Sequence, residues 1–168
     1  MNLRKASLEN ITELRKICIG AYGLNFKNHW IENGYELYIE KEFSIERLTS
    51  DINSKNEDYY FIEYENSSVG FIKIKTKISS KIADCELIKI YILPTYKGKG
   101  FGKFALLSII NKMKALNKKT LLLDVIDTNL NAITFYKKLG FKKVGKITLN
   151  EPFFKDELRG MDVMVLDI

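Results

Sequence analysis

The chain has 168 residues, a length typical of one domain, and 46% of them are hydrophobic and 29% are charged. This composition excludes a disordered or collagen-like chain, and no apolar run approaches the roughly 20 residues that a membrane-spanning helix needs. The net charge of +6 indicates an anionic partner, of a kind that the total does not specify.

The charge is unevenly distributed along the chain. Residues 1–66 carry 8 basic and 12 acidic side chains, a net −4, whereas residues 67–150 carry 17 basic and 4 acidic side chains, a net +13. Residues 151–168 carry 2 basic and 5 acidic side chains, a net −3. A cationic middle segment therefore separates two acidic ends, and its lysines could also serve only as a solvated surface.

The N-terminal part is predicted to be mainly helical. Residues 2–6 fit a short strand, and residues 8–22 place apolar side chains at helical spacing after Ser7 as N-cap. Residues 25–41 are aromatic and acidic with a glycine inside, which predicts a broken helix. A further helix is expected after Ser44.

The central part predicts consecutive strands. Residues 58–65 and 69–78 form a hairpin around the turn 66–68, and the lysines alternating with apolar residues in the second strand indicate a half-exposed face. Another strand is expected over residues 84–93, where Pro94 ends it.

The C-terminal half alternates helices and strands. The expected helices are Phe101–Leu116 and Asn131–Leu139, and the expected strands are Thr120–Ile126, Phe141–Leu149 and Met161–Leu166. Runs of strands with interspersed helices predict an α+β or mixed α/β sheet, and no linker interrupts the chain.

Cysteine and histidine are sparse. Cys18, Cys85 and the single His29 have no metal-ligand spacing, so no metal site is expected. Cys18 falls on a helical apolar stripe and is expected in the core. The charged N-terminus lacks the features of a secretory signal, so we expect a cytoplasmic protein with reduced thiols.

A glycine-rich segment, KGKGFG, lies between a predicted strand and a predicted helix. Its glycines can expose successive backbone N–H groups, and the following helix adds its positive end, which together favour an anion such as a phosphate. The Walker pattern fails because Phe104 follows Gly102-Lys103, and a dinucleotide pattern with Asp124 as its acidic residue fits weakly. The residues expected to bind phosphate are Lys97, Gly98, Lys99, Gly100, Phe101, Gly102 and Lys103.

Residues 86–141 contain a set of short motifs in a fixed order: Lys97-x-x-Gly100-x-Gly102, Asn129-x-x-Ala132, Phe135-Tyr136 and Gly140-Phe141. With these motifs the segment resembles the core of the GNAT superfamily of acyl-CoA-dependent N-acyltransferases. The loop after the strand that ends before Pro94 has the family form R/Q-x-x-G-x-G/A, with lysine in place of the usual Arg or Gln. The segments NHWIENGYELYIEKEFSIERL and YYFIEYENSSVGFIKIK are more loosely similar to bacterial spermidine/spermine N-acetyltransferases of this superfamily.

The resemblance implies a single domain over residues 1–168 with a GNAT-like α/β fold. Its central, mostly antiparallel sheet would be splayed between two parallel strands, 85–92 and 120–126, with helices on both faces. The pantetheine arm of acetyl-CoA would lie in the gap, and backbone N–H groups would stabilise the oxyanion of the thioester. Besides the loop, the residues implied to bind acetyl-CoA are Ile90, Tyr91, Ile92, Asn129, Ala132 and Tyr136.

The resemblance also implies two catalytic residues. An alkyl amine is protonated at pH 7 and must lose a proton before it attacks a thioester. Glu86 is the candidate base, with strand geometry or pairing to a lysine as its structural alternative. Tyr136 is the candidate acid for the leaving thiolate, with aromatic packing as its alternative. Cys85 would point to the opposite face of the strand from Glu86, so it is not expected to act as a nucleophile.

The expected function is transfer of an acetyl group from acetyl-CoA to a primary amine by direct attack, with a polyamine or another small cationic amine as acceptor. A protein N-terminal or side-chain amine is the alternative acceptor, and a degenerate CoA-binding sensor is the alternative to an enzyme. No nucleic acid and no membrane are expected as partners, and a homodimer is an open alternative to a monomer. The acceptor side is expected from Trp30, Tyr35, Glu36, Tyr38, Glu40 and Glu42, unless these belong to an amphipathic helix with its acids in water.

Overall fold

A computed structural model describes residues 1–168 as one seven-stranded sheet with the strand order β1-β2-β3-β4-β5-β7-β6. All neighbouring strands are antiparallel except β4 and β5, which are parallel. The strands are β1 (Asn2–Lys5), β2 (Glu57–Tyr64), β3 (Ser67–Lys75), β4 (Cys85–Ile92), β5 (Thr120–Ile126), β6 (Lys142–Thr148) and β7 (Gly160–Asp167). The helices are α1 (Ile11–Phe26), α2 (Gly34–Phe43), α3 (Ile45–Asn53), α4 (Phe101–Ala115) and α5 (Leu130–Lys138).

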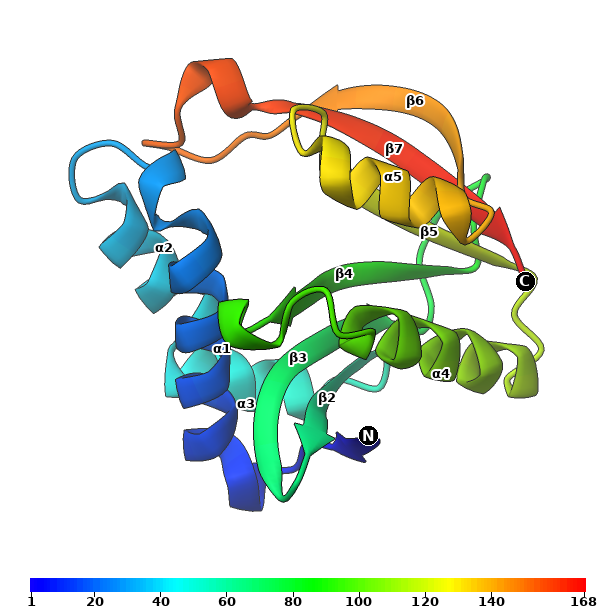
Figure 1. Ribbon diagram of the computed structural model, residues 1–168, viewed down its shortest axis with the longest axis horizontal. Coiled ribbons are helices and arrows are strands. Elements are labelled where there is room, and N and C mark those ends of the chain that lie inside the picture. Colours follow the sequence, from blue (N-terminus) through cyan, green and yellow to red (C-terminus); the bar gives the residue numbers. More distant parts are fainter.

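Helices cover both faces of the sheet, as expected (Figure 1). On one face, α1, α2 and α3 pack on β2 and β3 through a core that includes Leu14, Phe43 and Phe71. On the other face, α4 and α5 pack on β3, β4, β5 and β7 through a second core that includes Ile109 and Tyr136. None of these helices has the length and apolar character to span a membrane.

The sheet forks between β4 and β5. These strands pair only where Cys85–Leu87 faces Leu121–Leu123. Beyond that point β4 stays with β3 and β5 stays with β7, and Figure 1 shows the two halves of the sheet separating toward the side where α1 and α2 lie. The expected splay between the two parallel strands is therefore confirmed.

A β-bulge lies at the fork. Lys73 and Ile74 of β3 are adjacent, yet they face Lys89 and Leu87 of β4, so Ile88 is the extra residue. The bulge changes which side chains share a face. Leu87 packs in the core under α4, whereas two residues later Lys89 points to the opposite face, where it pairs with α2.

Local capping signals in the N-terminal part act as the sequence predicts. Ser7 and Asn10 form a capping box before α1, and the Ser44 hydroxyl accepts a hydrogen bond from the backbone N–H of Arg47 at the start of α3. The predicted break in the aromatic segment is the 3-10 helix Lys27–His29 between α1 and α2. Cys18 is fully buried in the core, as expected.

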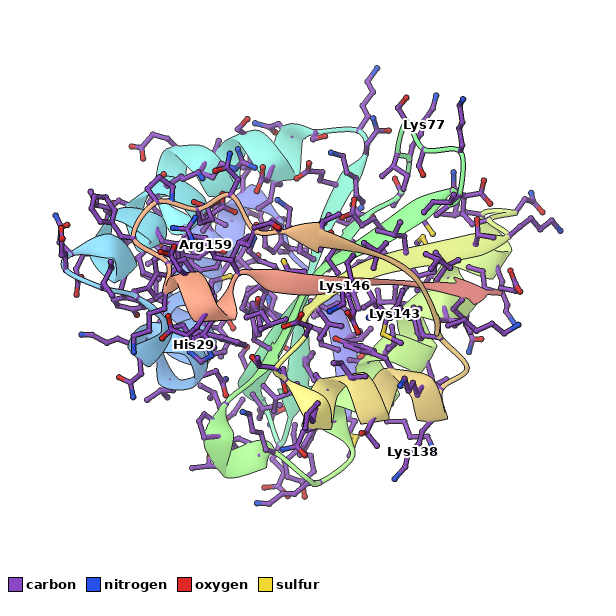
Figure 2. The ribbon with its side chains drawn as sticks, turned by 90° about the horizontal axis from the view of Figure 1, so that it is seen from above. His29, Lys77, Lys138, Lys143, Lys146 and Arg159 are labelled. Carbon is purple, nitrogen blue, oxygen red and sulfur yellow. The ribbon has the colours of Figure 1, made fainter.

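The segment between β6 and β7 folds back on the break between α1 and α2. The N–H of Ile31 donates to the carbonyl of Phe153 at 2.9 Å, and the N–H of Lys155 donates to the carbonyl of His29 at 2.9 Å. Figure 2 shows His29 and Arg159 on either side of the 3-10 helix Asp156–Leu158 that follows these contacts. The acidic C-terminal part of the chain is thereby held next to the acidic N-terminal part.

Candidate active site

A cavity of about 1060 Å³ lies between the separated halves of the sheet. It is lined by β4, β5, the loop before α4 and the start of α4, and α5. The end of α1, the break after it, α2, and the end of β6 with the segment that follows complete the lining. Among the residues predicted to bind acetyl-CoA or to act in catalysis, only Lys99 does not line it; its ammonium group lies 5.5 Å from the centre of the Tyr96 ring. The predicted residues that do line it are Glu86, Ile90, Tyr91, Ile92, Lys97, Gly98, Gly100, Phe101, Gly102, Lys103, Asn129, Ala132 and Tyr136.

One end of the cavity is built from backbone N–H groups. Gly98 and Gly100 have φ angles of 74° and 88°, in the left-handed region that side chains disfavour. Gly100 is also the N-cap of α4, and the first intrahelical bond runs from the N–H of Phe104 to its carbonyl at 2.9 Å. The N–H groups before Phe104 are therefore free for a ligand, and Lys103 adds a positive charge beside them.

The edge of β4 presents backbone groups to the cavity. The N–H of Leu93 donates to the carbonyl of Val69 on β3 at 2.9 Å. Backbone groups of successive strand residues point to opposite sides, so those of Ile92 and Ile90 point away from β3 toward the opening. The amide of Asn25 on α1 donates to the carbonyl of Ile92 at 3.1 Å, which agrees with this direction. Fixed N–H donors of this kind can stabilise a developing oxyanion.

The wall opposite β4 comes from α5. The side chain of Asn129 accepts a hydrogen bond from the N–H of Ala132 at 3.2 Å and so caps α5. Tyr136, on the following turns, is 9% exposed, and burial raises the pKa of its phenol. A neutral phenol that borders the cavity can donate a proton or a hydrogen bond, in addition to packing against Phe135 and Phe141.

The other end of the cavity is aromatic. Trp30 and Tyr38 line it as predicted, and the indole N–H of Trp30 donates to the hydroxyl of Tyr22 at 3.1 Å. Phe154, from the segment after β6, meets the Trp30 ring edge-on at 4.9 Å between centroids. The aromatic rings therefore come from α1, the break after it, α2 and the C-terminal segment. Such a surface suits methylene chains and cations.

Three residues expected on the acceptor side lie elsewhere. The side chains of Glu36 and Glu40 are 61% and 66% exposed and pair with Lys27 and Arg15 in solvent. Tyr35 does not line the cavity either, because its hydroxyl packs against Gly23 of α1. The helical period explains the result for α2, where Tyr38 and Glu42 share the inner face and Glu36 and Glu40 point outward.

Four carboxylates line the cavity. They are Glu42, Glu86, Asp124 and Glu151. Burial raises the pKa of Glu86, and the negative charge of Asp124 raises it further. Burial also raises the pKa of Asp124. Cys85 points into the core on the other face, where burial raises the pKa of its thiol to about 11, in agreement with its exclusion as a nucleophile.

Several lining residues are not apparent from sequence motifs. Asn25, Tyr22 and Phe154 come from elements that meet only in the folded chain, so their spacing carries no signal. For Asp124 a signal exists, because it is the one charged residue of the apolar strand TLLLDVI. A carboxylate inside such a strand needs a partner or a role.

Comparisons of the sequence with known proteins agree with this geometry. The profile of the Acetyltransferase (GNAT) family matches residues 24–141. The spermidine N(1)-acetyltransferase of Thermoplasma acidophilum is 29% identical over 146 residues, which span 84% of this chain and 88% of that protein. The [ribosomal protein bS18]-alanine N-acetyltransferase of Haemophilus influenzae is 35% identical over 94 residues, which span 55% of this chain and 61% of that protein.

Solved structures share the whole fold. The PaiA N-acetyltransferase from Thermoplasma acidophilum in complex with coenzyme A superposes with a TM-score of 0.79 and 22% identity, over 99% of this chain and 98% of that chain. The ribosomal-protein-S18-alanine N-acetyltransferase from Escherichia coli superposes with a TM-score of 0.75 and 17% identity, over 99% of this chain and 93% of that chain. The chain thus shares its overall fold with these two N-acetyltransferases.

Proposed function

The chain belongs to the GNAT acetyltransferase family and is an acyltransferase, and we propose that its acceptor is the primary amine of a small polycationic molecule of the polyamine class. The observation that carries the proposal is the two-ended cavity. A lysine-flanked loop of free N–H groups forms one end, and aromatic rings with carboxylates form the other. An anionic donor and a cationic acceptor would therefore meet at the fork between β4 and β5.

The donor side suits acetyl-CoA as co-substrate. The pyrophosphate would bind the N–H groups between Gly98 and Lys103, with Lys97 and Lys103 contributing charge. The N–H groups of Ile90 and Ile92 would face the thioester carbonyl, and the amide of Asn129 keeps its N–H donors for the pantetheine arm. These assignments rest on the orientation of the backbone and on the family resemblance.

The chemistry requires one proton to leave and another to be supplied. An alkyl ammonium has a pKa of about 10.4, so neutralising it at pH 7 costs on the order of 4–5 kcal/mol. Glu86 would accept this proton, and its raised pKa makes it a stronger base than an ordinary carboxylate. The amine nitrogen would then form a bond to the acetyl carbon and lose its second proton to solvent as the carbon–sulfur bond breaks. Tyr136 would give its proton to the leaving thiolate and regain one from solvent, so that the products are the N-acetyl amine and CoA thiol.

Two features support a polyamine as the acceptor. Relatives named spermidine N(1)-acetyltransferase match most of the chain, including the one from Thermoplasma acidophilum. The acceptor end also combines aromatic faces with carboxylates, which bind ammonium groups through cation–π contacts and ion pairs. The alternative acceptor is a protein N-terminal amine, supported by the match to the bS18-alanine enzyme over about half of the chain.

Release of CoA thiol from acetyl-CoA, measured with a panel of acceptors, tests the proposal. Spermidine and other polyamines should give the highest kcat/KM, and peptides with an N-terminal alanine should give little turnover. If such a peptide is turned over preferentially, the acceptor is a protein N-terminal amine and the proposal of a polyamine acceptor is wrong. Tight binding of CoA without turnover of any amine would contradict the proposal and indicate a sensor.

A further inference from the structure

The four carboxylates that line the cavity are not equivalent. Glu42 pairs with the ammonium group of Lys89 at 2.9 Å, and Glu151 pairs with that of Lys41 at 2.7 Å. Glu86 and Asp124 form no ion pair within the protein, although both are about half-buried. The cavity therefore holds two negative charges that the chain itself does not neutralise.

These two carboxylates lie on the same face of adjacent strands. Glu86 faces Leu122 in the parallel register, so Asp124 is two residues beyond it on β5. Paired strands lie about 4.8 Å apart and two residues advance about 6.6 Å, a separation of about 8 Å between Cα atoms. Asp124 is one residue past Leu123, the last paired residue of β5, so its Cα lies at about this distance from that of Glu86 or farther. The charge of Asp124 is close enough to raise the pKa of Glu86.

Asp124 is also incompletely satisfied. Its Oδ1 atom is buried and has no hydrogen-bond partner, although the residue lines the cavity. A buried carboxylate oxygen without a donor is unfavourable, because it has lost its hydration and gained nothing in return. A cationic donor on a ligand would supply what the protein does not.

We propose that Asp124 is a specificity-determining residue, which binds the second ammonium group of an acceptor whose first amine reacts at Glu86. The proposal rests on the proposed function and narrows it to acceptors with two ammonium groups separated by a short methylene chain. Such a dication neutralises both free carboxylates at once. When Glu86 accepts the proton of the reacting amine, the pair between Asp124 and the other ammonium remains and holds the acceptor in place.

The other acidic residues fit this role less well. A second ammonium group at Glu42 would have to displace Lys89, which is 8% exposed and lies over the rings of Tyr38 and Phe43. A second ammonium group at Glu151 would likewise have to displace Lys41, which pairs with it at 2.7 Å. Asp124 is the carboxylate next to Glu86 that is still free to bind a cation.

Putrescine and butylamine test this inference, because they share a four-carbon chain and differ only in the second amine. Wild-type enzyme should show a kcat/KM for putrescine at least about tenfold above that for butylamine. Asp124→Asn should lower kcat/KM for putrescine about tenfold to a hundredfold, mainly through KM, which is the range for a hydrogen bond between charged groups. Its kcat/KM for butylamine should fall far less, because butylamine has no second ammonium group for Asp124 to bind and is affected only through the lower pKa of Glu86 that follows from loss of the Asp124 charge.

Asp127→Asn is the matched control, since Asp127 follows the same strand but pairs with Lys146 at the surface and does not line the cavity. Asp127→Asn should leave kcat/KM for both acceptors unchanged. Equal loss of activity toward both acceptors in Asp124→Asn would show a structural role and overturn the inference.

The wild-type ratio tests the inference without any variant. If putrescine and butylamine react equally well, Asp124 does not select for a second ammonium group and the inference is wrong. The proposed acetyl transfer to a small amine would still hold. If the wild-type enzyme acetylates neither amine but acetylates a peptide terminus, both the proposed polyamine function and the inference about Asp124 are wrong.

Discussion

At the residue scale, the environment of Glu86 sets its chemistry. Burial and the negative charge of Asp124 both favour the protonated form of Glu86. The positive charges of Lys75 and Lys73 on β3 favour its ionised form. The balance raises the pKa of Glu86, so the carboxylate holds a proton more tightly than an exposed glutamate does. A base at this position therefore matches the proton of an ammonium group better than a surface carboxylate would.

Glu86→Gln should lower kcat about a hundredfold to ten-thousandfold, the usual contribution of a general base. In the wild type, kcat/KM should rise with pH as Glu86 loses its proton, with the acidic limb above the ordinary value of 4.5 because the pKa is raised. The variant should lack this limb. Steady-state kinetics over pH checks this, and Glu63→Gln on β2, which pairs with Arg4 outside the cavity, is the control. An unchanged pH profile in Glu86→Gln would remove Glu86 from the mechanism.

Tyr136→Phe should lower kcat by about tenfold to a hundredfold and leave KM nearly unchanged. The loss is smaller than for the base because a thiolate with a pKa of about 8.5 leaves without strict need of an acid. Tyr60→Phe is the matched control, since Tyr60 belongs to the same core but its hydroxyl contacts Asp58. If both variants behave alike, Tyr136 serves packing alone.

At the element scale, the conformation of the loop before α4 decides whether an anion can bind. Nothing lies within 4 Å of a Cβ added at Gly98 or Gly100, so space does not require glycine there. The requirement is the left-handed backbone, which turns the N–H groups of the first helical turn toward the cavity. The element therefore depends on backbone geometry more than on its lysines.

Gly100→Ala should destabilise the protein by about 1–2 kcal/mol, the penalty of a side chain in the left-handed region, and raise the KM for acetyl-CoA. Urea unfolding and initial-rate kinetics measure the two effects. Gly20→Ala in α1 is the control, because its new Cβ meets only Leu93 at 3.8 Å and alanine favours a helix. A Gly100→Ala protein with unchanged KM would show that the loop conformation does not serve cofactor binding.

At the scale of the whole molecule, charge is divided between the two ends of one cavity. The segment 67–150 supplies the loop lysines of the donor end, whereas the acidic N-terminal segment supplies Glu42 and the C-terminal segment supplies Glu151 at the other end. Salt screens the attraction between an anionic co-substrate and exposed lysines, and the screening (Debye) length is about 10 Å at 0.1 M ionic strength. The distribution of charge thus predicts a measurable dependence on salt.

The KM for acetyl-CoA should rise with ionic strength, and Lys103→Ala should raise it about twofold to fivefold at low salt and weaken the salt dependence. Lys99→Ala is a matched control on the same loop, since the Lys99 side chain lies over Tyr96 outside the cavity. Equal effects of the two substitutions would mean that the lysines act only through the general field of the loop.

The fold and the loop residues that line one end of the cavity were predictable from the sequence to a large extent because their signals are local. Helical periodicity, capping by Ser7 and Ser44, and the glycines of the loop each depend on residues within a few positions of one another. The acceptor end was predicted only in part. Three of the six residues expected there, Tyr35, Glu36 and Glu40, do not line the cavity.

By itself, the sequence determined the order of the elements, the glycine-rich loop before α4 and the strand that carries Glu86, since each follows from backbone preferences over short distances. Only the tertiary structure decided where the sheet opens, because the bulge at Ile88 and the end of the β4–β5 ladder depend on pairing with distant strands. It also decided which carboxylates are neutralised and which face the cavity unpaired, because Lys89, Lys41 and Asp124 reach their places from separate elements.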